Sequence, residues 1–306
     1  MKQFLFPKCL IIALLFLAPF FLHAQITKAS GGDYITLMGV PENQIATQVN
    51  IYKDQGYMPV FVDACFFEGK PLQGTSRPAN LGVFATLIFK KNPGRINVQL
   101  AKYNSSNVFL AQYAALKAQG WYISNLDAYL NNNQEAYLAI WVKGNSAPWG
   151  IVVDSPLNQH QNAFNQLSSE GYRMVNRVYH NQPAPGDEVV DVQHITSLFT
   201  KQSNPIFAKS QLTYPEYAKL CVDMKQQDFV LTFLDIHRGY FSPIFTKKPN
   251  FTPLSTFPAH GQSSVLTKQA IEQWSQQGYY PLFVICDSAA QEDYYPQYAV
   301  WLVKAN

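Results

Sequence analysis

The feature of this sequence that most constrains its fold is a block of about 50 residues that occurs five times along the chain. In each copy a helix-like stretch ends at a marker position, an aromatic residue follows, and two strand-like runs separated by a turn complete the block, the second closing on lysine. The marker positions are Gly56, Gly120, Gly171, Asp228 and Gly278, which are 64, 51, 57 and 50 residues apart. A unit of that size buries too little surface to be secure alone, so we expect the copies to pack on one another.

The local chemistry of each block favours a helix, a strand and a hairpin in that order. Glycine after a helical stretch such as residues 108–118 is a common left-handed helix stop, because it has no Cβ to clash at positive φ. Asp228 is tolerable at this position since Asp adopts the same conformation more readily than most residues. Extended runs before the helices, clearest at residues 34–37, 96–100 and 150–153, add one more strand to each unit.

The sequence therefore predicts an α+β fold, built as a tandem array of five helix-plus-antiparallel-strand repeats. We assign residues 25–306 to a single repeat-array domain. The expected units cover residues 33–92, 95–145, 149–202, 205–248 and 252–306. Curvature of the array, its closure and its oligomeric state do not follow from these patterns.

Residues 1–24 have the layout of a secretory signal. Two lysines precede an apolar stretch at residues 10–22, and the segment ends on Ala24. A membrane anchor is the competing interpretation, but this run of 13 residues contains Pro19 and is shorter than the roughly 18 that span a bilayer. We therefore expect a secreted or periplasmic protein with no transmembrane helix after signal removal.

The composition excludes a disordered tail and a broadly basic surface. Of 306 residues, 47% are hydrophobic and 14% are charged, which is enough apolar material for a sizeable core. The formal net charge is +3, and removal of the two lysines of the signal leaves 21 basic against 20 acidic residues. A chain so close to neutral lacks the charge that non-specific nucleic-acid binding needs, and we expect no nucleic-acid partner.

The expected mature chain contains three cysteines, Cys65, Cys221 and Cys286. An odd number cannot pair completely within one chain, and three in so long a chain are no disulfide framework. Buried free thiols are therefore the expected state. Cys65 and Cys286 occupy nearly equivalent repeat positions, and the sequence leaves open whether closure of the array brings them together.

With these motifs the chain resembles the bacterial tandem repeat domain family, whose repeats also form the amino-terminal part of polyglycine hydrolases. The resemblance is carried by the Gly-aromatic strands at residues 56–60 and 278–282 and by the closing strands at residues 137–143 and 298–304. It covers essentially the whole mature chain, and the third and fourth copies depart most from the pattern, the fourth by Asp228 at the marker. The resemblance implies a secreted, repeat-built binding or scaffolding region. In polyglycine hydrolases the chemistry belongs to a separate serine-hydrolase domain, whose Ser-x-x-Lys motif is missing here.

Standard catalytic and metal-binding signatures are missing as well. The chain has no Gly-x-Ser-x-Gly elbow, no P-loop, no His-Glu-x-x-His and no Cys-x-x-Cys. The mature histidines are never three or four residues apart, so no helix offers a ready metal pair. We expect no cofactor and no bound metal. Catalysis stays open as an alternative, because a triad can assemble from distant parts of a sequence.

One face of the repeated strand is the candidate ligand site. At the fifth, seventh and ninth positions after the marker the copies carry a mixed polar and aromatic set, while the alternate positions are more apolar, so strand alternation puts the two sets on opposite faces. The candidate ligand-binding residues are Asp63, Asn125, Asp127, Asn176, His180, Asp235, His237 and Asp287. Two other interpretations stand beside a ligand surface. The recurring aspartates can cap a hairpin turn, or Asp235 or His237 can act as an acid or base.

The expected function is binding or scaffolding of a polysaccharide or protein ligand, such as a peptide, outside the cytoplasm and without catalysis. The alternative is a secreted hydrolase with an Asp/His site on the repeated strand face, and a purely structural envelope or surface protein is a third interpretation. The lysines that close the five blocks are interpreted as protection of strand edges or as solvated strand ends. They are Lys90, Lys143, Lys201, Lys247 and Lys304.

Overall fold

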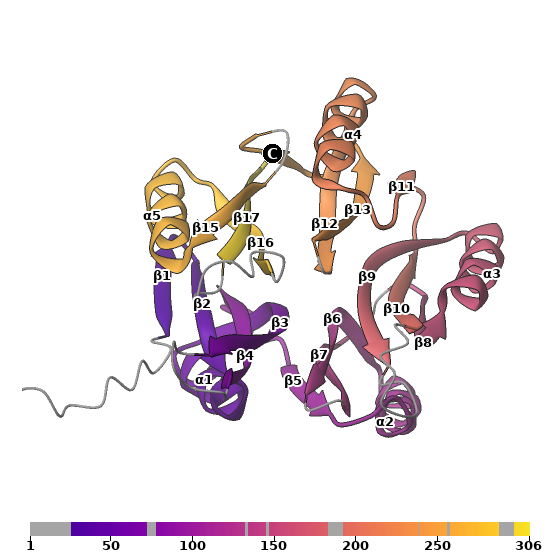
Figure 1. The fold of residues 1–306 in the computed structure, drawn as a ribbon, viewed down its shortest axis with the longest axis horizontal. Helices are drawn as coiled ribbons and strands as arrows, with labels where there is room; N and C mark the ends of the chain where they lie inside the picture. The colour runs from indigo at the N-terminus through magenta and orange to yellow at the C-terminus, as the bar shows by residue number, and fades with distance from the viewer. Residues whose placement is uncertain are drawn as a thin grey trace, which may run out of the picture.

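The computed structural model describes residues 26–71, 78–131, 134–144, 147–182, 192–237, 239–255, 258–287 and 297–306. The expected secretory signal at residues 1–24 lies outside these ranges. Within them the chain forms five antiparallel sheets and five α-helices, with one helix beside each sheet (Figure 1). The predicted α+β class is thereby confirmed. No helix in the described ranges is both long enough and apolar enough to cross a bilayer.

We call each sheet with its helix a blade and number the blades in chain order. Blade 1 contains β1 (Thr27–Gly31), β2 (Tyr34–Pro41), the 3-10 helix η1 (Glu42–Gln44), α1 (Ile45–Asp54), β3 (Tyr57–Pro71) and β4 (Pro78–Lys91). Blade 2 contains β5 (Val98–Tyr103), α2 (Ser106–Ala118), β6 (Trp121–Asn131) and β7 (Gln134–Lys143). Blade 3 contains β8 (Trp149–Pro156), α3 (Leu157–Ser169), β9 (Tyr172–Gln182) and β10 (Val192–Lys201). Blade 4 contains β11 (Ile206–Ala208), α4 (Tyr214–Gln226), β12 (Phe229–His237) and β13 (Tyr240–Lys247). Blade 5 contains β14 (Phe251–Pro253), β15 (Ala259–Ser263), α5 (Ser264–Ser275), β16 (Tyr280–Asp287) and β17 (Gln297–Ala305).

The sheets share one arrangement of strands. The last strand of each blade (β4, β7, β10, β13 or β17) lies in the middle of its sheet, between the strand that precedes the helix and the strand that follows it. The strand that follows the helix (β3, β6, β9, β12 or β16) pairs on one side only and lies nearest the centre of the molecule, so we call it the inner strand (Figure 1). The helices lie on the outside (Figure 1).

The five inner strands follow one another around the centre and close a ring. β3 contacts β6, β6 contacts β9, β9 contacts β12, β12 contacts β16, and β16 returns to β3. Blade 5 also reaches blade 1 farther out, where α5 packs on β1. One hydrophobic core contains buried residues from every blade, among them Met38, Trp141, Met174, Phe245 and Trp301. One hydrophobic core therefore extends through all five blades.

The helix stops lie where the sequence predicts them. α2 begins after Ser105, whose hydroxyl accepts a hydrogen bond of 3.3 Å from the Val108 amide. The marker positions have left-handed φ values of 82°, 79°, 88°, 62° and 84° at Gly56, Gly120, Gly171, Asp228 and Gly278. All five therefore have the conformation predicted for the point at which a helix gives way to a strand.

All five inner strands share an irregularity at the same place. The pairing with the central strand shifts between the third and the fifth residue after the marker, as between Ile123 and Asn125 in blade 2. The same shift occurs in the other four blades. An extra residue of this kind is a β-bulge, which bends the strand and increases its twist. Beyond the bulge both faces of the inner strand are buried, as Leu126 and Asp127 show.

The closing lysines protect no strand edge, because the closing strands lie in the middle of their sheets. In four blades the ammonium group lies over the ring of the aromatic residue that follows the marker, which is a cation–π contact. The distances from Nζ to the ring centroid are 5.8 Å for Lys143 and Trp121, 5.9 Å for Lys201 and Tyr172, 5.5 Å for Lys247 and Phe229, and 6.0 Å for Lys304 and Tyr279. In blade 1 the register places Lys91 opposite Tyr57, whereas Lys90 lies over Tyr34 at 5.6 Å. Edge protection was therefore the wrong interpretation.

Replacement of Gly120 by Val is expected to destabilise the protein by more than about 1 kcal/mol, because a β-branched residue is strained at a φ of 79°. The added Cβ would have no neighbour within 4 Å, so backbone strain and not crowding sets the cost. Gly120→Asn is the matched control and should cost clearly less, since Asp228 adopts the same conformation in blade 4. Urea denaturation followed by circular dichroism measures both variants. A Val variant as stable as the wild type would contradict the role of Gly120 as a helix stop.

Candidate functional site

The candidate face residues lie on the inner strands, and most of them are buried. Exposed fractions between 2% and 9% are found for Asn125, Asp127, Asn176, His180 and Asp235. Asp63 and His237 are half-buried, while Asp287 belongs to β16 and its side chain lies outside the described part. The five buried residues do not face solvent, because this face packs on the inner strand of a neighbouring blade. Ligand binding by the set stays a prediction.

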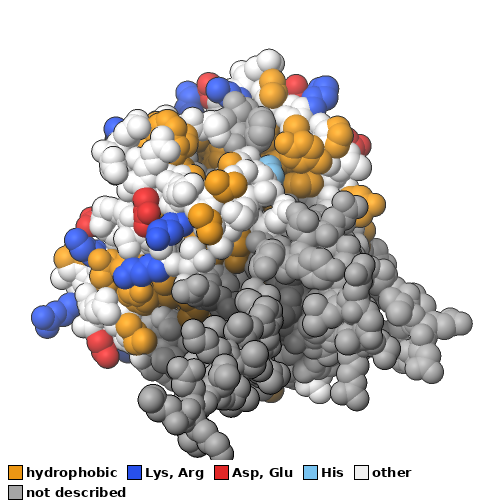
Figure 2. Space-filling view, turned by 60° about the vertical axis from the view of Figure 1, so that its left-hand side comes forward, with side chains coloured by type: hydrophobic (Ala, Val, Ile, Leu, Met, Phe, Trp, Pro, Cys, Tyr) orange, Lys and Arg blue, Asp and Glu red, His pale blue; other side chains and the backbone are white. Residues whose placement is uncertain are grey.

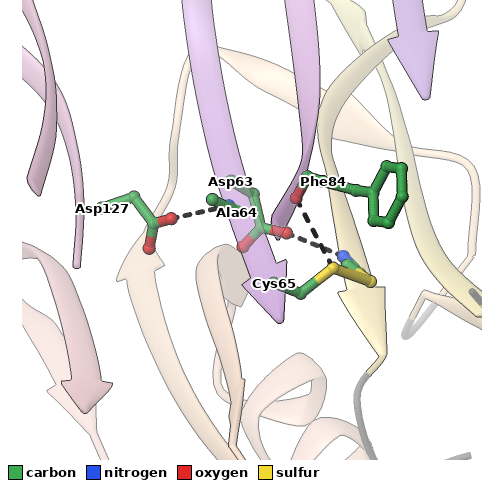
Figure 3. The surroundings of a disulfide bond; sticks show 6 residues. Asp63, Ala64, Cys65, Phe84 and Asp127 are labelled. Carbon is green, nitrogen blue, oxygen red and sulfur yellow. Dashed lines mark hydrogen bonds between the residues drawn. A yellow bond between two sulfur atoms is a disulfide. The ribbon is translucent and has the colours of Figure 1, made fainter. Parts of the chain in front are cut away.

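Blade 2 is bonded to blade 1 through two side chains of β6. The Asp127 Oδ2 atom accepts a hydrogen bond of 2.6 Å from the backbone amide of Ala64 (Figure 3). The Asn125 Oδ1 atom accepts one of 2.9 Å from the amide of Val62. Both donors belong to β3, which has a strand of its own sheet on one side only. The side chains therefore satisfy backbone groups at the open edge of the adjacent sheet.

The same kind of bond recurs at two other junctions. The Asp235 Oδ2 atom accepts from the amide of Tyr179 at 3.2 Å and joins blade 4 to blade 3. The Asp63 Oδ2 atom accepts from the amide of Cys286 at 2.8 Å and joins blade 1 to blade 5 (Figure 3). In all three cases the acceptor is the seventh residue after its marker, and the donor is the eighth residue after the marker of the adjoining blade. These aspartates act as acceptors between blades, so the turn-cap interpretation is wrong.

The two remaining junctions use other groups. Between blades 2 and 3 the Asn176 Nδ2 atom donates to the Leu126 carbonyl oxygen at 2.9 Å. Between blades 4 and 5 the Trp301 Nε1 atom donates to the Leu231 carbonyl oxygen at 3.1 Å. An apolar residue replaces the aspartate at both junctions. Sequence reasoning missed Trp301, because a tryptophan on a closing strand is indistinguishable from an ordinary core residue.

A disulfide closes the ring. Cys65 on β3 is bonded to Cys286 on β16, with the two Cα atoms 6.2 Å apart and the residues 221 positions apart in sequence (Figure 3). The expectation of three free thiols is wrong for this pair, because closure brings the first and last inner strands together. Cys221 is free and buried, as expected.

Burial of three aspartates around the centre of the ring raises their pKa values. Desolvation raises the pKa of Asp63 and of Asp235 to about 7, and it raises the pKa of Asp127 well above its ordinary value. The charge of Asp63 contributes to the shift at the other two carboxyl groups, so the three are close enough to repel one another. Hydrogen bonds from backbone amides lower these pKa values but do not offset burial.

A second group of functional side chains lies where blade 2 meets blade 3. Glu135 comes from β7, Asp154 from β8 and His180 from β9, and one possible ligand atom of each lies within 4.8 Å of the other two. The Asp154 Oδ1 atom is 3.2 Å from His180 Nε2 and 2.6 Å from Nδ1 of His194, a residue of β10. We call these four residues the His–acid cluster. Imidazole nitrogens and carboxylate oxygens together are the donor types of a transition-metal site.

The surrounding residues hold the His–acid cluster in place. Asp154 has a φ of 49°, which is uncommon for a residue other than glycine, and its amide donates to Thr196 Oγ1 at 3.0 Å. The Tyr137 hydroxyl donates to Glu135 Oε2 at 3.2 Å. Burial acts to raise the pKa of Asp154, but hydrogen bonds and positive charge from the two imidazoles outweigh it and hold that pKa below its ordinary value.

Of this cluster, sequence reasoning pointed to His180 alone. The other three residues lie outside the aligned strand positions, and the four come from four strands of two blades. Each of the four residues lies within three residues of the end of its strand. These strand ends all lie on the side of the sheet where a hairpin links the inner strand to the last strand of the blade. Titratable residues at the hairpin ends of neighbouring strands are the sequence signal that could have found this cluster.

The fold and its junctions define an α+β protein made of helix-and-sheet units that close a ring. The family model of the polyglycine hydrolase-like structural repeat matches the chain at residues 31–71, 105–144 and 146–181. These segments lie in blades 1, 2 and 3, so the chain carries this repeat and the resemblance noted from the sequence is confirmed. A search of the curated proteins found no match.

The raised aspartate pKa values predict that folding free energy is lost as the pH rises. The pKa of Asp63 is higher in the folded protein than its ordinary value of 3.8. The tighter binding of the proton in the folded state stabilises the fold, and this contribution is fully present below about pH 4. This contribution declines until the pH reaches about 7, where Asp63 and Asp235 ionise in the folded state. Asp63→Asn keeps an acceptor for the Cys286 amide without the charge. We expect this variant to match the wild type at about pH 4 and to exceed its stability by at least about 1 kcal/mol at about pH 8.

Asp63→Ala is the control for this experiment, because it removes the acceptor together with the charge. It should be less stable than Asp63→Asn at every pH, since the buried Cys286 amide loses its partner. Chemical denaturation of the three proteins across this pH range gives the comparison. A pH dependence identical in the wild type and Asp63→Asn would show that the Asp63 carboxyl is not the source of the effect.

Removal of the disulfide is expected to destabilise the protein by about 2–5 kcal/mol, because a cross-link between residues 221 positions apart strongly restricts the unfolded chain. The double variant C65S/C286S tests this by thermal denaturation. A reductant should lower the Tm of the wild type toward that of the double variant and leave the double variant unchanged. If the Tm of the wild type were the same with and without reductant, closure of the ring by this disulfide would be contradicted.

Proposed function

We propose that the protein is an exported binding or scaffolding module, without catalysis of its own, whose five blades are copies of one repeat. The observation that carries the proposal is that side chains at the repeated inner-strand positions form hydrogen bonds between blades, as Asp127, Asp235 and Asp63 do. The recurring polar positions therefore build a rigid ring. Such a ring presents similar blade ends several times over, which suits a ligand that contacts more than one of them.

Two regularities support five copies of one repeat. Every marker position is left-handed, including Asp228, and every inner strand has its bulge at the same distance from the marker. The family repeat matches blades 1 to 3, and blades 4 and 5 share both regularities with them. A shared backbone pattern of this kind favours duplication of one supersecondary unit.

Export is supported by the disulfide between Cys65 and Cys286. Bonds of this kind form and persist in oxidising compartments outside the cytoplasm. The layout of residues 1–24, with two lysines before an apolar stretch, points to the same destination, a secreted or periplasmic protein.

We assign ligand contact to the side of the ring at which the helices begin. Each helix begins soon after the strand that precedes it ends, so the first helical turns of successive blades lie on the same side. Four apolar side chains are exposed there, with exposed fractions between 47% and 58%. They are Val108 in α2, Leu157 in α3, and Val265 and Leu266 in α5. We call these four residues, which lie on three separate helices, the first-turn residues. On the face drawn in Figure 2, acidic, basic and hydrophobic side chains are interspersed over the part that is described. Such a mixed surface suits an uncharged extended chain.

Glycan and peptide arrays probed with the purified protein test this assignment. For a ligand found there, we expect the double variant L157S/V265S to lose at least about tenfold in affinity, which is about 1.4 kcal/mol. Its Tm should change little, because both side chains are exposed. Ile96→Ser is the matched control, since Ile96 is 46% exposed but lies just before β5, on the opposite side of the ring. A double variant that binds as the wild type does would contradict ligand contact by the first-turn residues, and two empty arrays would contradict binding of these ligand classes.

The alternative function is a secreted hydrolase with an Asp/His site on the repeated strand face. One observation favours it, because Asp154 contacts His180, a member of that face, and an acid and a base are thus within hydrogen-bond distance. Each ligand found on the arrays is therefore also assayed for cleavage. Turnover that is abolished by His180→Ala and retained by Asp235→Asn would replace the binding proposal with hydrolysis at this cluster.

A further inference from the structure

We propose that the His–acid cluster between blades 2 and 3 is a divalent metal site, and that zinc is the ion its donor atoms favour. Glu135, Asp154 and His180 are the ligands in this proposal. His194 is a positioning residue, since its Nδ1 atom lies 2.6 Å from Asp154 Oδ1. Metal binding by these residues does not require a ligand at the first-turn residues.

The geometry of the three ligands is close to what zinc requires. Zinc binds imidazole nitrogen at about 2.0–2.1 Å and carboxylate oxygen at about 2.0–2.2 Å, so tetrahedral ligand atoms lie roughly 3.4 Å apart. The ligand atoms of Glu135, Asp154 and His180 already lie within 4.8 Å of one another. A movement of roughly 1 Å through side-chain torsions therefore brings them to coordination distance.

The charges of the cluster also favour a cation. Glu135 and Asp154 are acidic residues, and a cation between their carboxylates would be attracted to both. The side chain of Asp154 is 16% exposed, so solvent screens its charge only in part. An imidazole supplies positive charge only when it is protonated, whereas a divalent ion neutralises both carboxylates and binds the neutral ring.

The donor types distinguish between classes of ion. Calcium and magnesium prefer oxygen ligands alone, whereas imidazole suits zinc and the neighbouring transition metals. A set of one imidazole and two carboxylates leaves a fourth position of a tetrahedral zinc site for water or a further ligand. The contact from His194 to Asp154 is the type of outer-shell hydrogen bond that orients a metal-bound carboxylate.

A metal ion bound at this junction would link two blades of the ring. Blade 2 supplies Glu135, and blade 3 supplies Asp154 and His180, so a bound ion cross-links two neighbouring blades. This junction has Asn176 bonded to Leu126 in place of the aspartate-to-amide bond found at three other junctions. An ion that binds only the folded ring raises its stability by mass action.

Zinc titration of the untagged protein, stripped of metal by a chelator, tests the proposal directly. We expect one zinc ion per chain by isothermal titration calorimetry and a rise in Tm with zinc concentration. Cobalt(II) in place of zinc should give the visible absorption of a tetrahedral site. A wild-type protein that takes up no zinc at micromolar concentrations would overturn the proposal without any variant.

Variants then locate the ion. Glu135→Gln, Asp154→Asn and His180→Gln preserve side-chain size and should each weaken zinc affinity by at least about tenfold. His160→Gln is the matched control, because His160 is a buried histidine of the same blade that contacts Ser197 Oγ at 2.7 Å, outside the cluster. Zinc binding that is equal in all five proteins would overturn the assignment.

A measurement on the wild type covers the case in which a cluster variant does not fold. The ring nitrogen resonances of His180 should shift on addition of one equivalent of zinc, and those of His160 should not. Zinc uptake with no change at His180 would place the ion elsewhere and overturn the proposal.

Discussion

The structure depends on how the open edges of the five inner strands are satisfied. Each inner strand pairs with its own sheet on one side only, so backbone groups on its other side face the next blade. A buried backbone group without a partner costs about 1–3 kcal/mol, and an open strand edge also invites pairing with other chains. Side chains of the adjoining inner strand bond to these groups, as Asp127 does to Ala64 and Asn176 does to Leu126. The blades are thus joined by interactions that exist only when inner strands lie side by side.

The junction between blades 5 and 1 differs from the others because chain connectivity does not help to close it. Four junctions join blades that are consecutive in the chain, whereas β16 and β3 come from opposite ends of the sequence. Bringing such distant segments together costs entropy that grows with the length of the loop. Here the disulfide, the bond from the Cys286 amide to Asp63, and the stacked rings of Tyr34 and Tyr280, with centroids 4.7 Å apart, act at one junction. Covalent closure therefore occurs where the entropic cost is greatest.

The sequence predicted the parts of a blade well and the contacts between blades poorly. A helix stop such as Gly120 depends on backbone sterics within a few residues, so it is visible locally, and even the exception at Asp228 follows from the same rule. Strand alternation placed Asn125 and Asp127 on one face, and both side chains bond to blade 1. The inner strand is covered on both sides, however, so Asp127 is an internal acceptor instead of part of an open ligand surface. The cysteine pair and the His–acid cluster depend on which blades become neighbours. That information lies in the closure of the ring and not in any local spacing.

The distribution of aspartates around the ring follows from the cost of burying like charges. An aspartate at the seventh position after every marker would bring five carboxyl groups toward the centre, and the charge of Asp63 already raises the pKa of Asp127 and of Asp235. Blades 3 and 5 have Val178 and Ile285 at this position, and both side chains are buried. Their junctions with the preceding blades use the uncharged donors Asn176 and Trp301. Identical blades would concentrate charge at the centre, so the differences between them are part of what allows the ring to close.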